Sequence, residues 1–104
     1  MRLQPAWIDS AIAGGVTHFY PSEFGIDISQ EGVRTHRYFR DKHATRDHLA
    51  MRAKENPSFK YTILLTGAFT EWLNHPAYGF DTETKTMTVY GSPDAMMSAT
   101  AVPE

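Results

Sequence analysis

Hydrophobic and polar positions follow a helical period at the start of the chain and then a run typical of a strand. From Leu3 to Ala13 the apolar residues recur every three or four positions, which predicts one face of an amphipathic helix. Gly14 and Gly15 follow, and glycine ends helices because it adopts the left-handed conformation readily. Val16 to Tyr20 is β-branched and aromatic, and Pro21 ends this run because proline cannot donate to a strand ladder. The pattern therefore predicts a helix followed by a short strand.

A second helix and a second strand are predicted after a polar loop. Residues 22–31 carry turn-forming residues without a period, which indicates a loop. A stripe at helical spacing then predicts a helix from about Arg34 to Glu55, ended by Asn56-Pro57. The stripe consists of Tyr38, Lys42, Thr45, Leu49 and Ala53. Tyr61 to Leu65 is a nearly continuous apolar run, typical of a strand buried on both faces of a parallel sheet, and we expect it to share a sheet with Val16–Tyr20.

The pattern changes after Pro76. Apolar residues at 78–80 and 87–90 flank the polar turn Asp81–Lys85, which favours a β-hairpin or meander over another helix and strand. We therefore divide the chain into an α/β part, residues 1–76, and a small β part, residues 77–104. Two parallel strands cannot bury both faces of a sheet, and no glycine-rich loop precedes a helix, so the N-terminal half of such a fold is expected to be missing.

Composition narrows the classes of function. The formal net charge of −2 gives no overall basic field, so we expect no nucleic-acid partner. No apolar run approaches the roughly 20 residues of a membrane helix, so no membrane partner is expected. The chain has no cysteine, which excludes disulfides and thiolate metal sites and fits a reducing compartment. Residues 1–9 lack the features of a signal peptide, and a cytoplasmic protein is expected.

The segment from Gly15 to Gly25 reads GVTHFYPSEFG. It resembles the GVkrF.PSEFG segment of the NmrA-like proteins, particularly the isoflavone reductase and phenylcoumaran benzylic ether reductase group. The similarity continues through Phe39-Arg40-Asp41-Lys42, through Tyr61–Leu64 with Gly67 and Phe69, and through Val89–Pro93, where the family often has tiyGdGn. It covers about residues 3–94.

This resemblance implies a partial Rossmann-like NAD(P)-binding sheet of the atypical short-chain dehydrogenase/reductase type. The cofactor implied is NADP, and Lys42 stands where the reductases carry their catalytic lysine. The loop after the first strand and the segment Gly67–Phe69 would flank the nicotinamide. The cofactor-binding residues expected on this basis are Pro21, Ser22, Phe24, Lys42 and Phe69.

Each candidate residue also has a structural interpretation. Lys42 could bind the nicotinamide ribose and act as general acid or base, or it could be a surface lysine whose stem packs along the helix. Tyr38 lies four positions earlier, the spacing of a tyrosine and lysine pair on one helix face, but could equally pack as an aromatic residue. Ser22 and Phe24 could touch cofactor or merely cap the next segment. Phe69 could stack near the nicotinamide or pack in the core.

Two charged sets favour structural roles. The histidines at positions 36, 43 and 48 lack the i, i+4 spacing of a zinc pair, so no metal site is predicted. Five arginines are interleaved with acidic residues, which favours a mixed-charge solvent face. They are Arg34, Arg37, Arg40, Arg46 and Arg52. Glu23 could be a structural carboxylate that holds its loop.

Three hypotheses of function follow. The first is a fragment of an NmrA-like NAD(P)H-dependent reductase that acts on a small aromatic molecule. The second is a non-catalytic NAD(P)-sensing regulator that binds a protein partner. The third is a truncated product without activity, in which exposed sheet edges promote self-association.

Overall fold

The structure is a computed structural model that describes residues 3–103, and it divides into two compact units. The first unit comprises Met1–Glu23 and Asp27–Leu64, and the second comprises Phe24–Ile26 and Leu65–Glu104. Apart from residues 24–26, the boundary between the two units therefore lies after Leu64. The sequence-based division into an α/β part, residues 1–76, and a small β part, residues 77–104, stays a prediction.

The first unit begins with α1, Gln4–Ala13, which ends as the two glycines predict. Gly15 has φ +84°, its amide donates to Ile12 O, and Val16 N donates to Ala11 O. This pair of hydrogen bonds is a Schellman motif, which satisfies carbonyls at the helix end. The predicted helix and its stop are confirmed.

The second predicted helix begins later than expected. α3 spans Arg40–Glu55, whereas residues before it form the short helix α2, Glu31–Arg34, and the 3₁₀ turn η1, Arg37–Phe39. His36 interrupts the helix because its backbone is extended and its Nδ1 accepts a hydrogen bond from Tyr38 N. The prediction of a helix from Arg34 was therefore wrong over its first six residues.

The two strands of the first unit pair in parallel, as predicted. β1, His18–Phe19, lies beside β2, Lys60–Tyr61, and α3 connects them. Lys60 N donates to Thr17 O, and Thr62 N donates to Phe19 O. A strand, a crossover helix and a parallel strand form a βαβ unit. The wider assignment to a partial Rossmann-like sheet remains a proposal.

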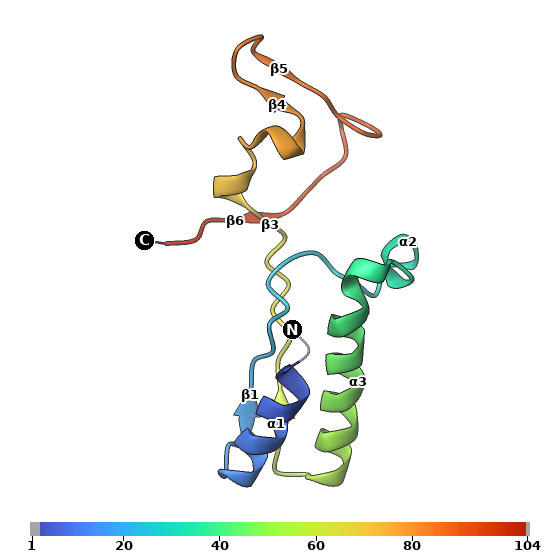
Figure 1. Cartoon of the computed structure of the whole chain (residues 1–104), viewed down its shortest axis with the longest axis vertical. Helices are drawn as coiled ribbons and strands as arrows, with labels where there is room; N and C mark the ends of the chain where they lie inside the picture. The colour runs from blue at the N-terminus through green and yellow to red at the C-terminus, as the bar shows by residue number, and fades with distance from the viewer. Residues whose placement is uncertain (1–2, 104) are drawn as a thin grey trace. The chain divides into compact units, whose positions relative to one another are not determined.

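The core lies between this strand pair and the two long helices, which run side by side in Figure 1. Ile8, Leu49 and Phe59 are buried at its centre, and Phe19 and Tyr61 pack against them from the strands. The opposite face of the strands carries His18, whose Nε2 lies 2.9 Å from Thr62 Oγ1.

The predicted strand Tyr61–Leu65 is only partly formed. β2 ends at Tyr61, and the side chains of Leu64 and Leu65 are 44% and 47% exposed. The expectation of burial on both faces was wrong, because the described sheet of this unit has two strands and helices on one face. Association through its exposed edges stays a prediction.

The second unit is built from short pairings. β3, Ala68–Phe69, pairs in parallel with β6, Ala99–Thr100, a strand that the sequence pattern did not predict. The 3₁₀ turns η2, Thr70–Trp72, and η3, Pro76–Tyr78, lead to the strand β4, Phe80–Asp81. β4 pairs antiparallel with β5, Thr86–Met87. This last pair confirms the predicted hairpin.

Candidate functional site

Lys42 lies at the carboxyl end of β1, where the chain continues into Pro21 and Glu23. In parallel sheets, ligands bind at the carboxyl ends of strands. The side chain of Lys42 comes from the third residue of α3 and is 8% exposed. Its Nζ donates to Glu23 O at 3.3 Å, which leaves two of its three N–H donors for other acceptors. Lys42 is therefore a buried cation directed at the loop after the strand.

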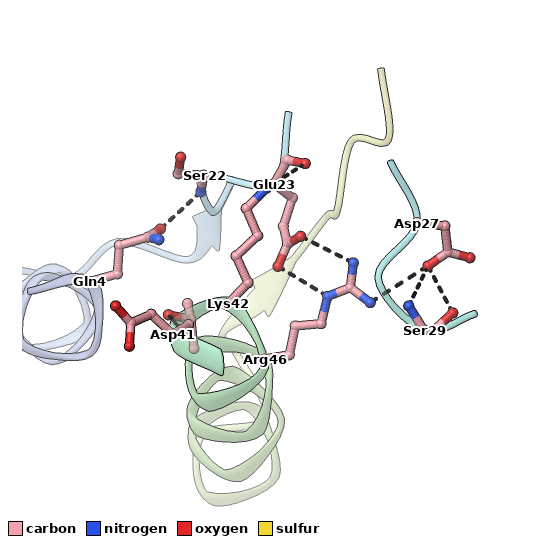
Figure 2. Close-up of polar contacts among 9 residues, drawn as sticks. Gln4, Ser22, Glu23, Asp27, Ser29, Asp41, Lys42 and Arg46 are labelled. Carbon is pink, nitrogen blue, oxygen red and sulfur yellow. Dashed lines mark hydrogen bonds and ion pairs between the residues drawn. The ribbon is translucent and has the colours of Figure 1, made fainter. Parts of the chain in front are cut away.

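Arg46 lies on α3 one turn after Lys42, and its side chain holds Glu23, as Figure 2 shows. Its carboxylate is 1% exposed and accepts two hydrogen bonds from Arg46, at 3.0 Å from Nε and 3.1 Å from Nη2. A bidentate guanidinium–carboxylate pair fixes both distance and orientation. Because the peptide oxygen of Glu23 is also the acceptor for Lys42, the pair positions the lysine as well as the loop.

Asp27 lies on the other side of Arg46, with Oδ1 3.8 Å from Nη1. The backbone amide and the hydroxyl of Ser29 donate to the same carboxylate at 3.0 and 2.7 Å. These hydrogen bonds, helped by the charge of Arg46, lower the pKa of Asp27 below its ordinary value. Arg46 is thus flanked by two carboxylates.

The start of the same loop is anchored to α1. Gln4 is 4% exposed, and its Oε1 accepts a hydrogen bond from Ser22 N at 2.8 Å. Pro21 is buried, whereas the side chain of Ser22 is exposed. The Nε2 of Gln4 is buried and has no hydrogen-bond partner in residues 3–103, so an unused donor lies on the helix that holds the loop.

The predicted site residues fall in both units. Pro21, Ser22 and Lys42 belong to the first unit and are brought together by β1 and α3. Phe24, 47% exposed, and Phe69, in β3, belong to the second unit. The roles of all five in binding cofactor stay predictions.

Tyr38 does not share a helix with Lys42. It lies in η1, ahead of α3, and its side chain is 78% exposed. The expected pairing on one helix face was wrong, because the chain turns at His36 before α3 begins. Its ring packs edge-on against Phe39, with the ring centroids 5.1 Å apart, which fits the interpretation of Tyr38 as an aromatic packing residue. A catalytic role for Tyr38 stays a prediction.

The role of Arg46 was not predicted from the sequence, and that of Glu23 was left open. Arg46 was assigned to a mixed-charge solvent face, but its side chain is 18% exposed and pairs with Glu23. The spacing of four residues from Lys42 places Arg46 on the same face of α3, and this signal was available in the sequence. The structure supports the structural interpretation of Glu23 as the carboxylate that holds its loop.

Other charged groups of α3 serve the helix packing. Asp9 of α1 lies 2.8 Å from His48 Nε2 and 3.0 Å from Arg52 Nε, which ties the two helices together. Within residues 3–103, no group of three or more histidines and carboxylates is placed to hold a metal ion. In the same part of the chain, no helix is long and apolar enough to cross a membrane.

The chain is similar to part of a known protein. The chain is 30% identical over 102 residues to oxidoreductase aprR of Aspergillus flavus. The match covers 96% of this chain and 34% of that protein, so the chain spans about a third of its relative's length. No protein-family model and no solved structure matches the chain. The similarity is thus to part of an oxidoreductase, and the finer resemblance to the NmrA-like group stays a prediction.

Proposed function

We propose that the chain forms the nicotinamide-side part of an NAD(P)H-dependent reductase of the NmrA-like type, acting on a small aromatic molecule. The observation that carries this proposal is the buried Lys42 at the carboxyl end of β1, with Nζ 3.3 Å from Glu23 O. The similarity to part of an oxidoreductase supports the same class of reaction. The reductase activity is proposed for a whole protein of which this chain forms part.

The residues present fit the sugar and nicotinamide end of such a cofactor. Lys42 retains two N–H donors, and the buried Nε2 of Gln4 has none of its hydrogen bonds satisfied in the described chain. Donors without acceptors suit a hydroxyl-rich ligand such as ribose. The sequence contains no GxGxxG loop, so these residues fit the cofactor's nicotinamide end and not its pyrophosphate.

Lys42 performs two tasks in the proposed reaction. NAD(P)H supplies the hydride when it is bound. The ammonium group of Lys42 binds a ribose hydroxyl, and it gives or takes the proton that accompanies reduction of the acceptor. Glu23 O restrains Nζ, and the Arg46 pair restrains Glu23, so that the lysine is positioned before any ligand binds. Burial of Lys42 strengthens its electrostatic interactions by excluding water.

Reduced nicotinamide riboside tests this proposal in the 104-residue chain. This probe carries the nicotinamide and ribose but no phosphate, so it reports only on the end that the chain is proposed to bind. We expect weak binding that shifts the NMR signals of the Lys42 Nζ and of residues 20–23.

Lys42→Met should abolish these shifts. Lys54→Met is the matched control, because Lys54 is an exposed lysine on the same helix, and it should leave them unchanged. Equal binding by the Lys42→Met chain would remove Lys42 from the site, and shifts confined to other residues would place the nicotinamide elsewhere.

A further inference from the structure

A basic hollow lies at the N-terminal end of α3, which Figure 1 shows beside α2. Its volume is about 480 Å³, within the size range of small-molecule sites. It is lined by Arg34, Thr35, His36, Arg37, Arg40, His43 and Asp47. Three arginines and one aspartate give it a net charge of +2 when both histidines are neutral. All of these residues belong to the first unit.

The arginines of this hollow differ in their partners from Arg46 and Arg52 of α3. Arg46 and Arg52 each pair with carboxylates at 3.0 Å or less. Among residues 3–103, no carboxylate lies within ion-pair distance of Arg34 or Arg37, and Arg40 has only a 3.8 Å approach to its neighbour Asp41. The contrast is informative because acidic residues outnumber Lys and Arg by 12 to 10 in the sequence.

His43 also lines the hollow. Its Nε2 is buried and has no hydrogen-bond partner in the described part of the chain. Buried polar atoms in native proteins nearly always have a partner, so this nitrogen has a hydrogen bond to gain from a group outside the described residues. The Nδ1 of His36 accepts from Tyr38 N, which leaves the other ring nitrogen of His36 for a ligand.

We infer that this hollow binds a small soluble molecule carrying a phosphate or diphosphate group. Guanidinium groups bind phosphate through paired hydrogen bonds, and one phosphate offers enough oxygens for several arginines at once. A net charge of +2 matches a ligand with at least two negative charges. The inference does not depend on the proposed reductase function, since none of the residues in the hollow takes part in the Lys42 site.

Pyrophosphate is the probe for this site. In an NMR titration of the 104-residue chain, the amide shifts should be confined to about residues 33–47. Arg34→Gln and Arg37→Gln should each weaken binding roughly tenfold, because each removes a charge-assisted contact. Both side chains are exposed, so the fold should be kept. Lys54→Gln, which removes a positive charge from an exposed site on the same helix, should leave the affinity unchanged.

Two further probes test whether the site prefers phosphate to carboxylate, and whether the phosphate belongs to a soluble molecule or to a lipid. Succinate, a dicarboxylate, should bind more weakly than pyrophosphate. The chain should not co-sediment with vesicles of phosphatidylcholine that contain phosphatidylinositol phosphate. The inference is overturned if pyrophosphate does not bind, if the Arg34→Gln Arg37→Gln double variant binds it as tightly, if succinate binds equally well, or if only the vesicles bind.

Discussion

The two units of the chain are stabilised in different ways. Every buried large hydrophobic side chain in the described residues belongs to the first unit, and these are Ile8, Ile28, Leu49 and Phe59. In the second unit, apolar side chains such as Tyr90 and Met96 are 94% and 101% exposed. The second unit is held by backbone pairing of β3 with β6 and of β4 with β5. The first unit thus has a core of its own, whereas the second depends on short hydrogen-bonded pairs.

Leu49→Ala should have the largest effect, because it removes a fully buried side chain from the core of the first unit. We expect a loss of roughly 2 to 5 kcal/mol in the free energy of unfolding. Met51→Ala is the control on the same helix, because Met51 is 47% exposed. Urea denaturation measures both.

Met96→Ala extends this comparison to the second unit. Its side chain is fully exposed, so the free energy of unfolding should change by less than about 0.5 kcal/mol. A loss in Met96→Ala as large as that in Leu49→Ala would contradict the difference between the units.

Arg46→Met should have the next largest effect. It leaves the Glu23 carboxylate, 1% exposed, without its bidentate partner. Removing one member of a buried ion pair is costly, and partial exposure of Arg46 reduces the loss to about 2 kcal/mol. Arg40→Met is the control, since Arg40 is 63% exposed and should cost little.

The Arg46→Met variant also tests how Lys42 is positioned. The Lys42 Nζ signal should broaden or shift in this variant, because Glu23 O is no longer held in place. An unchanged Lys42 signal together with full stability would show that the pair does not support the site.

Features fixed by neighbouring residues were the ones that the sequence predicted well. The end of α1 follows from Gly14 and Gly15, and the β4–β5 hairpin follows from a polar turn between apolar residues. The parallel pairing of β1 with β2 was also predicted, because a helix separates two strand-like runs. In each case the signal lies within a few adjacent positions or in the order of elements.

Features that depend on distant partners were missed. The Arg46–Glu23 pair joins residues 23 positions apart, and charge patterning alone cannot distinguish it from a solvent-exposed arginine. β6 is formed by Ala99 and Thr100, which carry no strand pattern, and its position is set by backbone pairing with β3. The late start of α3 was missed for a local reason, because His36 Nδ1 accepts a hydrogen bond from Tyr38 N, and such side-chain to backbone bonds compete with helix formation.

Acid should weaken both units slightly, through one aspartate in each. Hydrogen bonds from Ser29, and then the charge of Arg46, lower the pKa of Asp27 in the first unit. Hydrogen bonds from Thr84 and Glu83 lower the pKa of Asp81 in the second. A lowered folded pKa means that each carboxylate stabilises its unit above the ordinary value of 3.8, and that this contribution is lost as the pH falls through the folded value.

Amide hydrogen exchange between about pH 5 and pH 2 can separate these two contributions, because it reports protection residue by residue. Asp27→Asn should remove part of the acid sensitivity only in the first unit, residues 3–23 and 27–64, and Asp81→Asn should do so only in the second unit, residues 24–26 and 65–103. Asp81 is exposed and the side chain of Asp27 is 35% exposed, so these effects should be the smallest of the set. If Asp27→Asn changed the acid response of the second unit to the same extent, the two units would unfold together, and the core of the first would then be stabilising the whole chain.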